Sequence, residues 1–255
     1  MQPTLNAVIR AGLPRGVRRQ RILGGPLRGK WIVTSWHDYP AAILGYTERP
    51  LLNWFAANVK PGETWLDIGA HYGYTAIALA RLVGGAGRVF AFEPMQSTAG
   101  YLAQTRALNQ FSQLTVVPFA LAAPDTLTTS RLPVVRGMVD STIAKNEAWY
   151  ETILVARLDW LWQRIAGDQL RVHGVKIDVQ GMELEVLRGM TNLLAQQKPR
   201  LIVEVHVGVD RACLLDFIEH AGYARRGTPI EPVAGEVEPR YVDDHSYAFM
   251  PISSS

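Results

Sequence analysis

Hydrophobic and polar positions alternate in two kinds of run between residues 51 and 250. Short runs that are apolar nearly throughout, such as 175–179 and 201–207, are typical of strands buried on both faces. Longer runs such as Tyr74–Val83 and Arg211–His220 have the length and pattern of helices. Short buried strands that alternate with helices predict an α/β fold with a mostly parallel sheet and helices on both of its faces.

The predicted elements fill most of the chain after residue 50. The predicted strands are residues 64–68, 88–92, 114–120, 126–133, 175–179, 201–207 and 246–250. The predicted helices are residues 51–59, 74–83, 98–109, 157–165, 183–190 and 211–220. Pro118 weakens the end of the third strand, and residues 126–133 fit an antiparallel excursion. Residues 137–142 in that excursion are interpreted as a surface loop.

Length and composition fit one large globular domain. The 255 residues are 48% hydrophobic and 19% charged, which is ordinary for a folded α/β protein. No run of 18 apolar residues predicts a membrane span, and we expect no secretory signal. The single cysteine, Cys213, indicates a reducing compartment, so we expect a cytoplasmic protein. We divide the chain into a basic N-terminal arm and lead-in, residues 1–40, and a catalytic domain, residues 41–255.

Positive charge is concentrated near the N-terminus. Residues 1–30 contain seven Lys and Arg and no acid, so the rest of this chain of net charge +3 carries −4. One interpretation is a solvated arm. The other is a weak contact of the Arg-rich residues 10–30 with a membrane or another anionic ligand.

The turn after the first predicted strand contains Asp67, Gly69, His71 and Gly73. A dinucleotide-binding G-x-G-x-x-G motif would need glycine at positions 69, 71 and 74, and two of these three fail. Asp67 would repel a pyrophosphate but attract the sulfonium and ammonium groups of S-adenosylmethionine. The pattern therefore favours S-adenosylmethionine over NAD, although Asp67 could instead only cap the turn.

Two further positions extend this predicted cofactor site. Glu93 lies 20 residues after Gly73 at the end of the second strand, where an acid can accept hydrogen bonds from ribose hydroxyls. Ala120 follows the third strand at the same edge of the sheet. Glu93 supports a nucleoside ligand without distinguishing between the two cofactors.

A second cluster surrounds the strand at 175–179. Lys176 and Asp178 are two residues apart and so lie on one face of a buried strand, where charges are costly unless they are paired or functional. Gly181 permits a tight turn, and Glu183 lies in the first turn of the next helix. An ion pair and a helix-capping acid would also explain this pattern.

These segments together resemble the FkbM family of S-adenosylmethionine-dependent methyltransferases. The resemblance covers about residues 40–250, and its ordered set of matching pieces is residues 44–48, 59–74, 89–94, 176–189 and 199–206. It implies a Rossmann-like class I methyltransferase fold with seven strands, one of them antiparallel near the end of the sheet. It also implies S-adenosylmethionine as methyl donor and O-methylation of a sugar or polyketide-type hydroxyl.

The resemblance also assigns roles by position. Asp67, Gly69 and Gly73 resemble the loop on the methionine side of the cofactor, Glu93 the ribose ligand, and Asp178 and Glu183 the site that faces the substrate. The chain departs from the family at His71, where asparagine is frequent, and at Gln180, where glutamate is frequent. His71 can still donate a hydrogen bond to the cofactor, whereas Gln180 cannot act as a base.

Methyl transfer to an alcohol needs alignment and a proton acceptor. The candidate bases are Asp178, His206 and Lys176, and Asp178 also adjoins the cofactor. Glu183 and Glu204 are predicted to contact the substrate. A divalent metal on Asp178, Glu204 and His206 is the alternative, but we favour catalysis without a metal.

The predicted function is therefore O-methylation of a small molecule or glycan by S-adenosylmethionine. One alternative is a methyltransferase that acts on RNA or another macromolecule, with the arginines as an anchor. The other is a non-catalytic nucleoside-binding protein.

Overall fold

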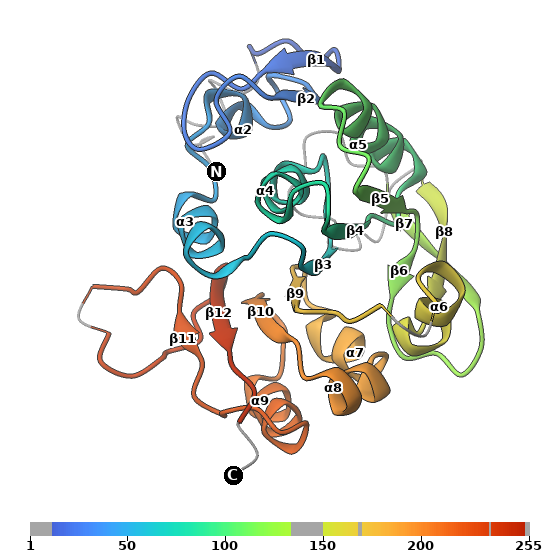
Figure 1. Ribbon diagram of the computed structural model, residues 1–255, viewed down its shortest axis with the longest axis vertical. Helices are drawn as coiled ribbons and strands as arrows, with labels where there is room; N and C mark the ends of the chain where they lie inside the picture. Colours follow the sequence, from blue (N-terminus) through green and yellow to red (C-terminus); the bar gives the residue numbers. More distant parts are fainter. Residues whose placement is uncertain (1–11, 134–149, 168–169, 235, 253–255) are drawn as a thin grey trace, which may run out of the picture.

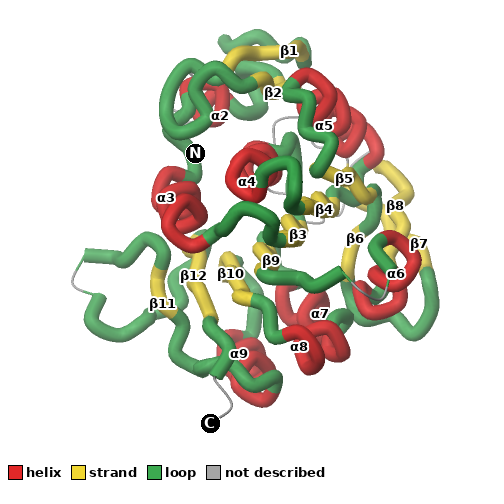
Figure 2. Tube along the Cα trace, in the orientation of Figure 1, coloured by secondary structure: helices red, strands yellow, loops and turns green. Residues whose placement is uncertain are grey.

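The computed structural model describes residues 12–133, 150–167, 170–234 and 236–252. A seven-stranded sheet forms its centre, in the order β11-β12-β10-β9-β3-β4-β5. These strands are β3 (Thr64–Ile68), β4 (Arg88–Phe92), β5 (Leu114–Val117), β9 (Gly174–Ile177), β10 (Arg200–Val205), β11 (Thr228–Pro229) and β12 (His245–Phe249). The row of strands crosses the centre of the molecule in Figure 2.

Strand direction confirms the predicted class I arrangement. The strands from β10 through β9, β3 and β4 to β5 pair in parallel, whereas β12 pairs antiparallel with both β10 and β11. The sheet is thus mostly parallel with one reversed strand near its end. The carboxyl ends of the parallel strands share one edge, where ligands bind in such folds.

Helices cover both faces of this sheet (Figure 1). Those on one face are α3 (Arg49–Asn58), α4 (Tyr74–Val83) and α5 (Gln96–Leu108). Those on the other are α6 (Leu158–Ile165), α7 (Glu183–Arg188), α8 (Thr191–Gln197) and α9 (Arg211–His220). Each layer closes its own core, since β3 directs Leu66 and Ile68 into one apolar cluster and Trp65 into the other. Helix α8 was not predicted.

A smaller sheet of order β6-β8-β7 lies beside β5. Its strands are β6 (Ala120–Leu121), β7 (Thr128–Pro133) and β8 (Tyr150–Ala156). The single strand predicted over 114–120 is wrong at its end, because the chain leaves the main sheet at Pro118 and continues as β6. The antiparallel excursion is confirmed by the pairing of β7 with β8. The predicted loop 137–142 lies outside the described residues.

The N-terminal region differs from the expected arm. Strands β1 (Arg18–Arg21) and β2 (Trp31–Thr34) form an antiparallel hairpin, and the short helix α2 (Pro40–Leu44) follows it. Ile22, Leu27 and Ile32 are buried, so apolar residues between the arginines attach the hairpin to the domain. The boundary at residue 40 and the anionic contact stay predictions. None of the helices in the described ranges is long and apolar enough to span a membrane.

Candidate functional site

A cavity of about 1150 Å³ lies at the carboxyl ends of β3, β4, β9 and β10. Its lining comes from the turns after these strands, from β6, β7 and β8, and from residues before α3. A site for one small molecule usually occupies about 300–1000 Å³. This cavity therefore has room for a nucleoside cofactor together with an acceptor.

Three charged side chains meet on one face of the sheet at this edge. Lys176 on β9 pairs across the sheet with Asp67 on β3, and its Nζ lies 3.4 Å from Asp67 Oδ1. The same Nζ lies 2.9 Å from Asp178 Oδ2. Asp67 and Lys176 are buried, whereas the side chain of Asp178 is 24% exposed and lines the cavity. The predicted same-face placement of Lys176 and Asp178 thus has a physical consequence, a buried ion-pair network.

The charge in this cluster is unbalanced. Burial opposes a charged amine, but Asp178 and then Asp67 hold the pKa of Lys176 above its ordinary value. Burial would raise the pKa of Asp178, but Lys176 holds it below its ordinary value. Two carboxylates thus face one ammonium group, and one negative charge remains for a cationic ligand.

Asp67 does not line the cavity, whereas the sequence places it beside the cofactor, and its contact with the cofactor stays a prediction. Its Oδ2 accepts a hydrogen bond of 2.7 Å from the Thr75 hydroxyl at the start of α4, and it does not line the cavity. Its Oδ1 is buried without a hydrogen-bond partner among the described residues. Asp67 therefore orients Lys176 and adds negative charge behind the cavity wall, while Asp178 presents the charge at the surface.

The turn after β3 is shaped by close contact with the turn after β9. A Cβ at Gly69 would lie 1.8 Å from the carbonyl oxygen of Asp178, and the φ of Gly69 is +84°. His71 also has a left-handed backbone, with φ 49°, and burial lowers the pKa of its imidazole to about 4. Gly69 and His71 line the cavity. Gly73, directly before α4, does not line it and instead packs against Leu102 of α5.

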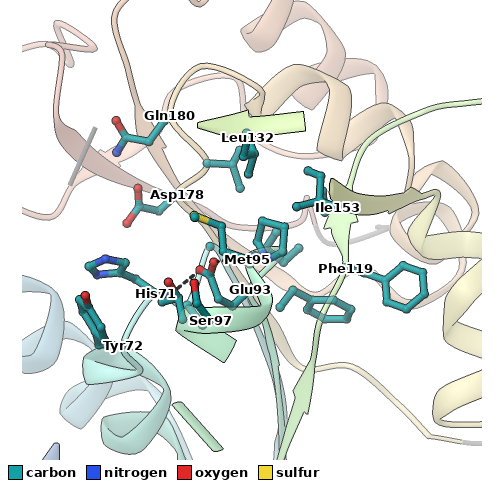
Figure 3. Close-up of a pocket in the computed structure, with 18 of the residues that line it drawn as sticks. His71, Tyr72, Glu93, Met95, Ser97, Phe119, Leu132, Ile153, Asp178 and Gln180 are labelled. Carbon is teal, nitrogen blue, oxygen red and sulfur yellow. Dashed lines mark hydrogen bonds between the residues drawn. The ribbon is translucent and has the colours of Figure 1, made fainter. Parts of the chain in front are cut away.

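Glu93 directly follows β4 and lines the cavity, beside Met95 and His71 (Figure 3). Its Oε2 accepts a hydrogen bond of 3.0 Å from the backbone N–H of His71, and its Oε1 accepts one of 3.0 Å from that of Met95. Burial raises the pKa of Glu93 to about 7 despite these bonds. Each oxygen keeps a second lone pair, so the carboxyl can still accept hydrogen bonds from a diol.

The two ends of the cavity differ in chemistry. Phe119, Leu132 and Ile153 form an apolar end, and Asp178 and Gln180 lie at the other (Figure 3). Ala120 also lines the cavity, as predicted from its place after the third strand. An elongated ligand with a flat apolar group at one end and positive charge at the other would match both.

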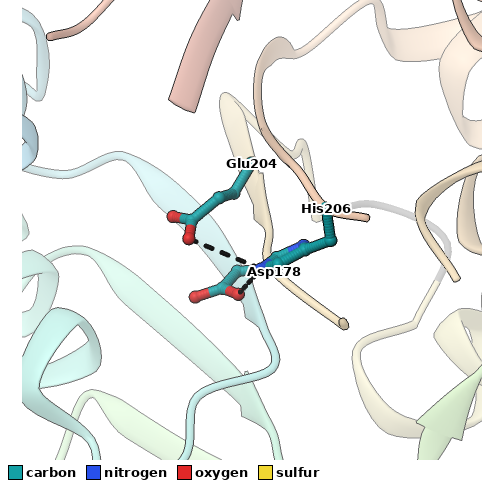
Figure 4. Close-up of side chains that lie close together, drawn as sticks. All are labelled: Asp178, Glu204 and His206. Carbon is teal, nitrogen blue, oxygen red and sulfur yellow. Dashed lines mark ion pairs between the residues drawn. The ribbon is translucent and has the colours of Figure 1, made fainter. Parts of the chain in front are cut away.

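His206, Glu204 and Asp178 come together from the ends of two neighbouring strands (Figure 4). His206 Nε2 lies 3.4 Å from Asp178 Oδ1 and 3.5 Å from Glu204 Oε1, and its Nδ1 lies 2.6 Å from Glu183 Oε1. Burial disfavours the imidazolium, but the bonds to Glu183 and Glu204 prevail and raise the pKa of His206 to about 10. His206 is therefore a cation at neutral pH.

This charge state corrects two predicted roles. A protonated His206 cannot accept a proton, and Lys176, with its raised pKa, cannot either. Candidate ligand atoms of Asp178, Glu204 and His206 lie within 4.8 Å of one another, which would suit a divalent cation if the ring were neutral. Catalysis without a metal stays a prediction.

Glu183 and Glu204 differ in their access to the cavity. Glu204 lines it, as expected of a substrate contact. Glu183 is fully buried behind His206 and does not line it, which corrects its predicted contact with substrate. Gln180 Nε2 lies 2.9 Å from His206 Nε2, so a protonated ring requires the amide to be turned with its oxygen toward the ring.

Sequence reasoning missed the wall that precedes α3. Asp38, Tyr39 and Glu48 line the cavity, although all three come from the region before the first predicted helix. Glu48 lies in the segment 44–48 that carries the family resemblance, so a signal was present without an assigned role.

The chain matches the model of the methyltransferase FkbM domain over residues 67–224. The chain belongs to the FkbM methyltransferase family. An FkbM methyltransferase from Methylobacillus flagellatus has a similar structure, with a TM-score of 0.51 and 22% identity over 73% of this chain and 43% of that chain. Fibrillarin from Aeropyrum pernix, solved with natively bound S-adenosylmethionine, shares the fold at a TM-score of 0.50 and 11% identity, over 92% of this chain and 82% of its own.

Among curated proteins, the hexuronic acid methyltransferase AglP of Haloferax volcanii is 53% identical over 53 residues. That alignment covers 18% of this chain and 22% of AglP. The chain thus spans less than half of AglP and of the Methylobacillus flagellatus protein. Membership of the FkbM family makes S-adenosylmethionine the cofactor.

The residues present fit this cofactor. Asp67 and Asp178, which share the single ammonium group of Lys176, suit a ligand that carries sulfonium and ammonium groups. Glu93 would accept hydrogen bonds from the ribose, and the apolar end would take the adenine. The cofactor supplies a methyl group on a cationic sulfur that leaves as a neutral thioether.

Proposed function

We propose that this FkbM family protein transfers a methyl group to a hydroxyl oxygen of a sugar or another small polyhydroxyl molecule. The observation that carries the proposal is the surplus of acids around the cavity. The carboxylates among the described lining residues are Asp38, Glu48, Glu93, Glu151, Asp178 and Glu204, and the permanent cations are Arg15, Arg131 and Lys176.

This surplus selects among acceptors. Carboxylates accept hydrogen bonds from sugar hydroxyls, and bonds to charged groups are stronger than those between neutral groups. A phosphate or a carboxylate would instead meet net repulsion inside the cavity. The surplus therefore favours a neutral or cationic hydroxyl acceptor over the RNA backbone. The name of AglP supports a sugar as the class of acceptor, although a hexuronic acid carries a carboxylate that the acceptor proposed here lacks.

The chain's part in the reaction is placement and proton removal. Asp178 and Glu204 can each accept a hydrogen bond from an acceptor that lies between β9 and β10. Lys176 and His206 hold these two carboxylates in fixed positions and keep Asp178 ionised. These fixed carboxylates align one hydroxyl of the molecule that is methylated.

Methyl transfer from labelled S-adenosylmethionine tests this proposal. We would offer neutral methyl glycosides of glucose, mannose and fucose beside free glucuronic acid and total RNA, and identify products by mass spectrometry. We expect a methyl ether of at least one neutral glycoside. Methylation confined to glucuronic acid or to RNA would contradict the proposal. If none of the offered compounds were labelled, transfer to all of these classes would be refuted.

A further inference from the structure

One carboxylate of the cavity forms no hydrogen bond or ion pair with any described residue, and it lies where a second cavity adjoins the first. Glu48 lines the main cavity and also a smaller one of about 210 Å³. Glu204 lines both as well, so these two side chains form the partition between them. Polar side chains dominate the far side of the small cavity, among them Glu231, Asp244 and His245.

The backbone at Glu48 is held in an unfavourable conformation. Its φ is 53°, in the left-handed region that residues with a Cβ rarely adopt. It is the residue before the first turn of α3, yet its side chain does not cap the helix. Strain of this kind persists where the surrounding structure enforces it, and such residues are concentrated at functional sites.

The other five acidic side chains of the cavity are all occupied. Each accepts a hydrogen bond or forms an ion pair, whereas Glu48 does neither with any residue of the described ranges. The partners are Tyr72 for Asp38, the backbone of His71 and Met95 for Glu93, Ser97 for Glu151, Lys176 for Asp178 and Ser246 for Glu204.

We propose that Glu48 is the general base that removes the proton from the acceptor hydroxyl. The inference rests on the proposed function and assigns a catalytic role that sequence reasoning gave to Asp178, His206 or Lys176. The acceptor oxygen bonds to the methyl carbon as its O–H bond breaks, and the proton passes to a carboxylate oxygen of Glu48. The electrons of the O–H bond stay on the hydroxyl oxygen of the acceptor, and those of the C–S bond stay on the departing sulfur.

The surroundings of Glu48 suit this role at neutral pH. Burial, and then the negative charge of Glu204, raise the pKa of Glu48 to about 7, although Lys176 opposes the shift. Asp178 and Asp67 also face it and act in the same direction as Glu204, and Tyr39 and Tyr74 are nearby. A base is most effective when its pKa is close to the working pH.

The test compares Glu48→Gln and Glu48→Asp with wild type, and uses Glu231→Gln as a matched control on the far side of the small cavity. The assay follows methylation of the neutral methyl glycosides. We expect Glu48→Gln to lower kcat by about 10²–10⁴-fold, the usual contribution of a positioned base. Glu48→Asp should recover part of the rate. The KM for the glycoside and the affinity for S-adenosylhomocysteine should change less than threefold, roughly.

The pH profile separates a base from a merely structural group. For wild type, kcat/KM should rise with pH up to about 7 and then level off, because the base must be ionised. The rise should be smaller in Glu48→Gln, where Glu93 alone still titrates near pH 7, and fully retained in Glu231→Gln. A Glu48→Gln variant with near wild-type kcat, or with an unchanged profile, would overturn the assignment.

A second readout does not depend on the acceptor. Carbon-13 NMR of protein labelled at the glutamate carboxyl should show two signals that titrate near pH 7, one from Glu93 and one that is missing from Glu48→Gln. If wild type methylates no glycoside, the proposed function fails, and this signal still decides the state of Glu48. A Glu48 signal that titrates at the ordinary acidic pH would overturn the inference.

Discussion

Three residues with side chains around the cavity have left-handed backbones. Glu48, His71 and Gln180 have φ values of 53°, 49° and 57°, and all three line it. Each such residue costs about 1–3 kcal/mol. The turns that hold His71 and Gln180 lie close together, since a Cβ at Gly69 would lie 1.8 Å from the Asp178 carbonyl oxygen. Sequence patterns could locate these turns but could not reveal their backbone geometry.

The protonation state of the site residues is the other property that the sequence could not predict. The residue types at 176, 178, 204 and 206 predicted a charged site, and the structure brings them together. Which of them can accept a proton depends on distances of 2.6–3.5 Å to neighbours from other strands. The ion pairs at those distances raise the pKa values of His206 and Lys176, and the base that we propose is Glu48, to which no role had been assigned.

The imidazolium of His206 should contribute to stability in a pH-dependent way. Its pKa is raised from 6.5 to about 10 in the fold, so its contribution is complete below about pH 6.5 and is lost as pH rises through about 10. His206→Gln leaves Glu183 buried without a cation and should cost about 3–5 kcal/mol at pH 7. Urea unfolding at pH 7 and pH 9.5 measures this.

The difference in unfolding free energy between wild type and His206→Gln should be smaller at pH 9.5 than at pH 7. The exposed His220 provides the control, since His220→Gln should change the unfolding free energy by less than about 0.5 kcal/mol. An equal gap at both pH values would show that His206 is neutral in the native protein.

At the level of elements, buried strands and their helices were predictable because their burial is nearly complete. The bounds of β3, α4, β4 and α9 agree with the predicted ranges. Elements outside the main sheet are less buried and have weaker patterns, so the hairpin β1–β2 and the strand β8 were missed. The hairpin sequence is dominated by exposed arginines, and only scattered residues such as Ile22 and Leu27 face the core.

The close contact between the turn after β3 and the turn after β9 leads to a prediction for Gly69. Gly69→Ala places a methyl group against the Asp178 carbonyl at a φ of +84°. We expect a loss of roughly 2–4 kcal/mol in unfolding free energy, from strain and steric overlap together. Binding of S-adenosylhomocysteine should weaken at least tenfold, roughly, because the turn can no longer close on a ligand.

Gly85→Ala is the matched control for this substitution. A Cβ at Gly85 meets no atom within 4 Å, and the position lies in the loop after α4. Thermal unfolding and calorimetry of both variants give the comparison. A Gly69→Ala protein as stable and as tightly binding as Gly85→Ala would show that the close approach is not required.

At the level of the whole molecule, charge is separated between surface and cavity. The overall charge is +3, and exposed arginines gather on the hairpin, whereas the cavity is lined mainly by acids. A weak anionic contact of the hairpin stays a prediction. The cavity charge is what argues for a cationic cofactor, and composition alone would have pointed the other way.

Isothermal calorimetry with S-adenosylhomocysteine, S-adenosylmethionine and NAD tests the central claim most directly. We expect one site for both sulfur nucleosides, no heat with NAD, and an affinity reduced tenfold or more, roughly, in Glu93→Gln, which loses a charge-assisted bond to the ribose. Binding of NAD at this site, or no binding of either sulfur nucleoside, would contradict the account.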